Sequence, residues 1–77
     1  MFTSKEVHNH LLQLSKNSTE EFPAIHLTII MTDLGIEEGM LIPILYDLNV
    51  LGKIHFTEGD QFVQLSFSGL YSRPGEE

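Results

Sequence analysis

The sequence has no cysteine, and only four of its 77 residues are lysine or arginine. Without cysteine the chain forms no disulfide, thiolate metal site or cysteine nucleophile. A small domain without disulfides is typical of the cytoplasm, where we expect this protein. The longest apolar run, residues 40–46, is far shorter than the ~20 residues of a membrane-spanning helix, and the first ten residues are too polar for a signal peptide. We therefore expect no membrane segment.

Positive charge is the second shortage. Eleven acids against four bases give a net charge of −7. Between Asn17 and Ser72 the only base is Lys53, whereas the same stretch holds these acids: Glu20, Glu21, Asp33, Glu37, Glu38, Asp47, Glu58 and Asp60. Nucleic-acid affinity comes largely from lysine and arginine that displace phosphate counterions. The composition therefore disfavours a nucleic-acid partner without excluding one.

The length of the chain limits it to one domain. We expect residues 1–70 to form that domain and residues 71–77 to be a flexible C-terminal tail. A chain this short buries only ~60–65% of the surface that its unfolded form exposes, so a deep catalytic cleft is not expected. No Ser-His-Asp order, phosphate loop or dinucleotide motif is present in the sequence. We expect no enzyme, no cofactor and no small-molecule substrate.

Apolar spacing predicts three helices, over residues 3–16, 29–34 and 36–51. Thr3 or Ser4 caps the first, and Thr28 caps the second. Gly35 and a glycine at position 52 follow the other two, where a left-handed residue commonly ends a helix. Pro43 lies inside the third helix and predicts a kink or a loosened first turn. Residues 24–27 are ambiguous and compatible with a brief extended segment before the second helix.

A β-hairpin is predicted over residues 53–67. The Gly59-Asp60 pair suits a type II′ turn, and this turn sets three cross-strand pairs: Thr57 with Phe62, Phe56 with Val63, and Ile54 with Leu65. In that register one face is apolar and consists of Ile54, Phe56, Val63, Leu65 and Phe67. The other face is polar, with His55, Thr57, Gln64 and Ser66, and it also carries Phe62 beside the turn. We expect residues 68–77 to be a tail in which Leu70 and Tyr71 are the only candidates to dock.

The segment from Leu27 to Ile54 contains Leu34-Gly35-Ile36, then the apolar positions Leu41, Leu45 and Leu48, and then Gly52 and Ile54. With this pattern the segment resembles the winged helix-turn-helix family, in its small prokaryotic type. The resemblance implies an α+β fold in which three helices precede a two-stranded hairpin, the wing. A short third strand before the second helix is left open. The resemblance also implies a DNA-binding transcriptional regulator whose third helix is the recognition helix.

The outward positions of the third helix differ from those of DNA-binding members of that family. Helical projection places Gly39, Pro43, Tyr46, Asp47 and Val50 on the outer face, with Met40 and Ile42 on its shoulders. None of these side chains carries a positive charge, and only Tyr46 offers a hydroxyl donor. Under the DNA-binding alternative, Tyr46 and Lys53 would be the nucleic-acid contacts.

The leading hypothesis is therefore a module that makes a protein–protein contact or a homodimer through the third helix and the wing. The candidate partner-binding residues are Met40, Ile42, Pro43, Tyr46, Val50 and Phe62, because contiguous exposed apolar residues often mark an interface. One alternative is that the helix kinks at Pro43 and returns some of these side chains to the core. Another is a structural accessory domain without a partner of its own.

The histidines do not predict a metal site. His8 and His10 lie two residues apart, so on a helix they point about 200° away from each other, whereas paired ligands lie three or four residues apart. We expect both on the surface. His26 and His55 have no acid or histidine at ligand spacing. The acidic pairs suit loop solvation, a helix N-terminus and a turn, so we expect no metal.

Overall fold

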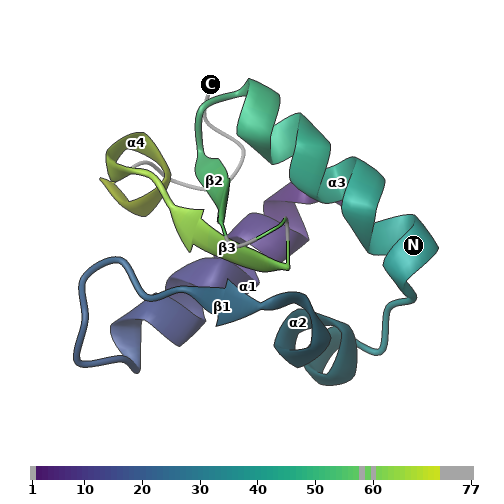
Figure 1. Ribbon diagram of the computed structural model, residues 1–77, viewed down its shortest axis with the longest axis horizontal. Coiled ribbons are helices and arrows are strands. Elements are labelled where there is room, and N and C mark those ends of the chain that lie inside the picture. Colours follow the sequence, from purple (N-terminus) through teal and green to yellow (C-terminus); the bar gives the residue numbers. More distant parts are fainter. Residues whose placement is uncertain (1, 58, 60, 72–77) are drawn as a thin grey trace.

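The computed structural model describes residues 2–57, 59 and 61–71. Within these residues the chain is an α+β protein of four helices and one three-stranded antiparallel sheet. The elements are α1 (Ser4–Lys16), β1 (Ile25–His26), α2 (Leu27–Leu34), α3 (Glu38–Val50), β2 (Ile54–Thr57), β3 (Phe62–Leu65) and α4 (Phe67–Tyr71). Figure 1 shows α1 behind the sheet, with α3 and α4 on opposite sides of the hairpin. The order differs from three helices followed by a hairpin, because β1 lies between α1 and α2, and α4 follows β3.

Helix α1 begins where its cap predicts. Thr3 has an extended backbone, and its Oγ1 accepts a hydrogen bond from the Glu6 amide at 3.2 Å. This bond satisfies one of the amides that the first helical turn leaves without a partner. Val7 and Leu11 are fully buried on the side that faces α3. Packing of this apolar face, more than helix propensity, holds the helix in place.

The α2–α3 connection is a tight turn at Gly35. Gly35 has φ +64°, and the amides of Gly35 and Ile36 both donate to the Met31 carbonyl. A left-handed residue at this place favours glycine, as predicted. Ile36 is buried in the turn itself, and α3 begins two residues later than predicted, with Glu37 as N-cap. Helix α3 runs through Pro43 without an interruption.

The cap of α2 differs from the prediction. The helix begins at Leu27, and His26 is the N-cap, with Nδ1 accepting a hydrogen bond from the Thr28 amide at 3.1 Å. Thr28 is therefore inside the helix. His26 takes the capping position because it belongs to β1, which pairs with β3 through Ile25–Val63 and His26–Phe62. This pairing provides the short third strand that the sequence left open.

The hairpin register is confirmed. The pairs Ile54–Leu65, Phe56–Val63 and Thr57–Phe62 are all present. Gly59 has φ +69°, the sign that a type II′ turn requires at this position, while Asp60 lies outside the described residues. Ile54, Val63 and Leu65 are buried and Phe56 is partly buried against the core, as the alternation predicts.

The prediction for residues 66–71, directly after β3, was wrong. Ser66 is buried and Phe67 is 73% exposed, because the strand ends at Leu65 and the alternation ends with it. Residues 67–71 form α4 instead of a tail, so Tyr71 is the last residue of a helix, and residues 72–77 lie outside the described residues. Ser66 Oγ accepts from the Gly69 amide at 2.9 Å and donates to the Gly52 carbonyl. This hydroxyl therefore ties α4 to the turn before β2.

The core lies between α1, α3 and the inner face of the sheet. Its buried apolar residues come from every element up to β3: Val7, Leu11, Ile25, Leu27, Ile30, Ile36, Leu41, Leu45, Leu48, Ile54, Val63 and Leu65. The predicted third-helix stripe of Leu41, Leu45 and Leu48 is fully inside. Since these three leucines occupy one side of α3, its opposite side faces solvent.

Candidate functional site

The outer side of α3 presents a row of apolar side chains. Met40 and Tyr46 are each 49% exposed, Val50 is 83% exposed, and Pro43 is exposed as well. These four positions fall within about one third of the helix circumference at 100° per residue, with Gly39 and Asp47 between them. We refer to Met40, Pro43, Tyr46 and Val50 as the α3 row. Four of the six predicted partner-binding residues therefore come together on one exposed surface.

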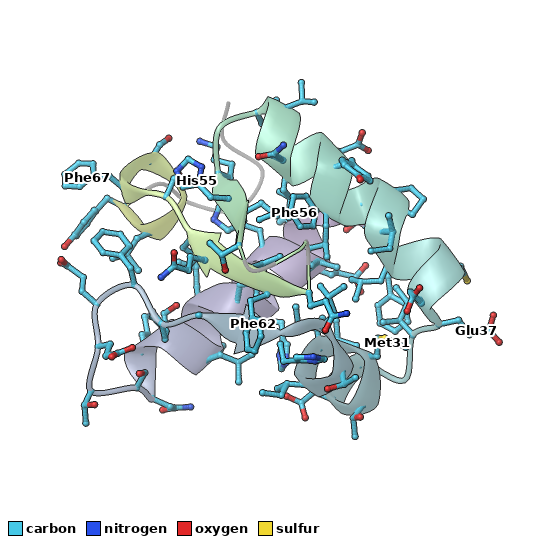
Figure 2. All side chains as sticks on the ribbon, in the orientation of Figure 1. Met31, Glu37, His55, Phe56, Phe62 and Phe67 are labelled. Carbon is cyan, nitrogen blue, oxygen red and sulfur yellow. The ribbon has the colours of Figure 1, made fainter. Side chains whose placement is uncertain are left out.

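Tyr46 is fixed against the hairpin. Its ring lies 5.2 Å from the ring of Phe56 on β2, centroid to centroid, with the planes tilted by 44°. Figure 2 shows Phe56 between the hairpin and α3. Aromatic pairs at such distances stabilise each other by about 0.5–1.5 kcal/mol beyond the area that they bury. Tyr46 is thus half exposed while its ring is already oriented.

Ile42 and Phe62 do not belong to the α3 row. Ile42 is half-buried and packs against the core. Phe62 is also half-buried and meets His26 edge to face, with ring centroids 4.8 Å apart and planes at 88°. Figure 2 places Phe62 over the sheet rather than on α3. Both residues therefore lie outside the α3 row, and the hairpin turns Phe62 toward His26 of β1.

A pocket opens beside the α3 row. It lies between the beginning of α2, the beginning of α3 and the turn side of the hairpin. Its volume is about 250 Å³, and its lining consists of His26, Leu27, Thr28, Met31, Glu38, Ile42 and Gln61. Figure 2 shows Met31 on α2, near the beginning of α3. No sequence pattern predicts this pocket, because it depends on bringing Gln61 next to residues of α2 and α3 that are distant from it in the chain.

The charges around α3 are acidic. Glu37, Glu38 and Asp47 are all exposed. Lys53, named under the DNA-binding alternative, is only 8% exposed, and its Nζ donates to Ser68 Oγ at 3.3 Å. The expected cation is therefore turned toward α4 instead of being presented beside α3. In the described part of the chain, the exposed lysines are Lys5 and Lys16, both on α1.

His8 and His10 both have partners within the fold. His8 is only 2% exposed, so the prediction of a surface residue was wrong, and its Nε2 is 2.6 Å from the Gly69 carbonyl oxygen. His10 Nε2 lies 3.0 Å from Asp33 Oδ2 and joins α1 to α2. Among the residues that the structure describes, no group of three or more histidine and acidic side chains could hold a metal ion.

A second exposed aromatic pair lies on α4. The ring centroids of Phe67 and Tyr71 are 4.7 Å apart, and the Tyr71 hydroxyl donates to Glu21 Oε2 in the loop between α1 and β1. This hydrogen bond, followed by desolvation and the charge of Glu21, raises the pKa of Tyr71 above its ordinary value of 10.0. Figure 2 shows Phe67 pointing away from the body of the protein.

Comparisons with known proteins identify no relative of this chain, so its function is argued from the geometry of the structure. No family model matches the chain, and neither does any curated protein or solved structure. None of the helices within the described residues is long and apolar enough to cross a membrane.

Proposed function

We propose that this chain is a non-enzymatic winged-helix module that binds another protein through the outer side of α3. In this arrangement α2, the Gly35 turn and α3 form the helix-turn-helix, and the β2–β3 hairpin is the wing. Support comes from the tight Gly35 turn, from the hairpin directly after α3, and from the pairing of β1 with β3. Helix α4 is an addition to this plan.

The observation that carries the function is the exposure of the α3 row. A surface helix of a small domain normally turns charged and polar residues to solvent. Here Met40 and Tyr46 remain 49% exposed and Val50 83% exposed on a single side of the helix. Full burial of a side chain such as methionine or valine against a partner contributes about 1.5–3 kcal/mol. Tyrosine is also enriched among the residues that dominate binding energy. The contact with Phe56 already orients the Tyr46 ring before a partner binds.

The charge of the surface defines the partner. The exposed Asp47 lies among the residues of the row, the exposed Glu38 lies at the first turn of the same helix, and the whole chain carries −7. An acidic rim repels acidic proteins and steers neutral or basic ones into contact. A second copy of this chain would bring the same acids together, so we propose a different protein, neutral or basic at the contact, as the partner.

DNA binding is the alternative function, and the position of α3 between a tight turn and a hairpin favours it. The electrostatics oppose it, because α3 contains no lysine or arginine and Lys53 is buried. A titration of the isotope-labelled chain with random duplex DNA at ~50 mM salt separates the two functions, since non-specific electrostatic binding is strong there. We expect no amide shifts on α3, and salt-sensitive shifts there would contradict protein binding as the role of this surface.

The direct test uses a random peptide library displayed on phage and selected on the full chain. We expect selected peptides to bind Tyr46→Ala and Val50→Asp at least about tenfold more weakly than the wild type, because each substitution removes an apolar side chain of the α3 row. Ile29→Asp is the matched control, since Ile29 is 45% exposed on α2 and outside the row. Peptides that bind all three variants as well as the wild type would refute the α3 row as the contact surface.

A further inference from the structure

The pocket beside the α3 row is formed by α2, α3 and the β2–β3 hairpin. The Leu27 amide donates to the Gln61 carbonyl at 3.0 Å. This bond joins the start of α2 to the turn side of the hairpin, directly before β3. Glu38 and Ile42 close the pocket from α3. Because side chains four residues apart lie on the same side of a helix, Glu38, Ile42 and Tyr46 form one line from the pocket to the row. The pocket and the row are therefore parts of one continuous surface.

Within the described residues, the pocket lining combines an apolar wall with one carboxylate. Leu27, Met31 and Ile42 supply the wall, while Glu38 supplies a carboxylate and Gln61 an amide. His26 Nδ1 accepts from the Thr28 amide and lies 2.8 Å from Thr28 Oγ1, so this ring nitrogen is already engaged within the protein. Among the residues that the structure describes, no lysine or arginine lines the pocket. A ligand that matches this lining has an apolar stem and a positively charged end.

The size of the pocket also limits its occupant. Sites for drug-sized ligands occupy ~300–1,000 Å³. At about 250 Å³ this pocket is smaller, and it is also open to solvent. One side chain of a bound protein fits such a site better than a free small molecule does. Lysine and arginine are the side chains with a long aliphatic stem and a cationic end.

We propose that the pocket receives a lysine or arginine side chain of the protein partner. The methylene stem lies against Leu27, Met31 and Ile42, and the cation lies beside the Glu38 carboxylate. This inference rests on the proposed function and adds to it the chemistry of the partner. The partner contacts the α3 row with apolar side chains and inserts one basic residue between α2 and α3.

The experiment uses peptides from the phage selection, measured by fluorescence anisotropy against the full chain. We expect the peptides to share a lysine or arginine, and its replacement by norleucine to weaken binding about two- to fivefold, as for a solvent-exposed ion pair. Glu38→Gln should cause the same loss. In the Glu38→Gln variant the norleucine replacement should cause no further loss, because the two changes remove one interaction. Glu20→Gln removes the same charge far along the chain and is the matched control.

Two results would overturn the inference. One is the selection of peptides without a common basic residue. The other is a norleucine penalty that is equally large in the wild type and in Glu38→Gln. Either result combined with loss of binding in Tyr46→Ala would refute the pocket while the α3 row stands. Peptides insensitive to both Tyr46→Ala and Glu38→Gln would refute the proposed function as well.

Discussion

The His8 ring nitrogen Nε2 lies 2.6 Å from the carbonyl oxygen of Gly69, so a buried histidine of α1 holds α4 across 61 positions of the chain. Gly69 is enclosed on its other side by the backbone of Lys53, where an added Cβ would lie 1.8 Å from the carbonyl oxygen. Helix α4 is thus held between α1 and the turn that leads into β2.

The first prediction concerns this close approach at Gly69. Gly69→Ala should destabilise the fold by about 1–3 kcal/mol, because α4 must move away from the Lys53 backbone to make room. Urea unfolding of the variant and the wild type measures the difference. Gly39→Ala is the control, since a Cβ at Gly39 meets nothing within 4 Å and alanine favours a helix interior. It should leave stability unchanged or raise it by up to about 1 kcal/mol. Equal effects of the two changes would contradict the packing of α4.

The second prediction concerns His8 itself. His8→Ala should cost about 1–3 kcal/mol, because it leaves the Gly69 carbonyl without its partner in a buried place, and the lost ring volume adds to this. His10→Ala is the comparison, since His10 pairs with Asp33 at a partly exposed site and should cost less than about 1 kcal/mol. A surface role for His8 would instead make the two losses similar. Thermal unfolding at a single pH ranks the variants.

The third prediction concerns the ionisation of Tyr71. In a Tyr46→Phe background Tyr71 is the only tyrosine, so absorbance near the tyrosinate band follows its titration directly. Because its pKa is raised, the folded state favours the neutral phenol, and the contact with Glu21 contributes fully below pH ~10 and is lost as pH rises through the folded pKa. Glu21→Gln should move this titration to lower pH. Glu20→Gln should not, and a shift of equal size in both would rule out the specific contact.

The hairpin shows how far sequence patterns reach. Alternation of apolar and polar residues together with Gly59 sets the register of β2 and β3, and all the predicted pairs occur. Both signals are local, since a strand's period and its turn lie within about a dozen residues. The glycine that ends α2 is predicted for the same reason. The left-handed conformation at this position favours glycine, and a glycine directly after an apolar helical pattern can be recognised in the sequence.

Three features that were not predicted from the sequence depend on residues distant in the chain. Helix α4 has only five residues, too few for a periodic pattern, and it is held by His8 and Ser66. His26 replaces Thr28 as the cap because pairing with Phe62 fixes its backbone. The outward side of α3 was predicted from helix geometry, yet the pocket was not, since Gln61 joins it only through the fold.

The contact between His8 and Gly69 also bears on how the chain folds. Closing a loop of this length costs more chain entropy than forming the α2–α3 turn or the hairpin, although the cost grows slowly with length. We therefore expect α4 to dock after the transition state, when the sheet that it packs on already exists. Contacts made that late act on the unfolding rate. In a chevron plot Gly69→Ala should leave the refolding rates unchanged. It should raise the unfolding rates and so shorten the lifetime of the native state.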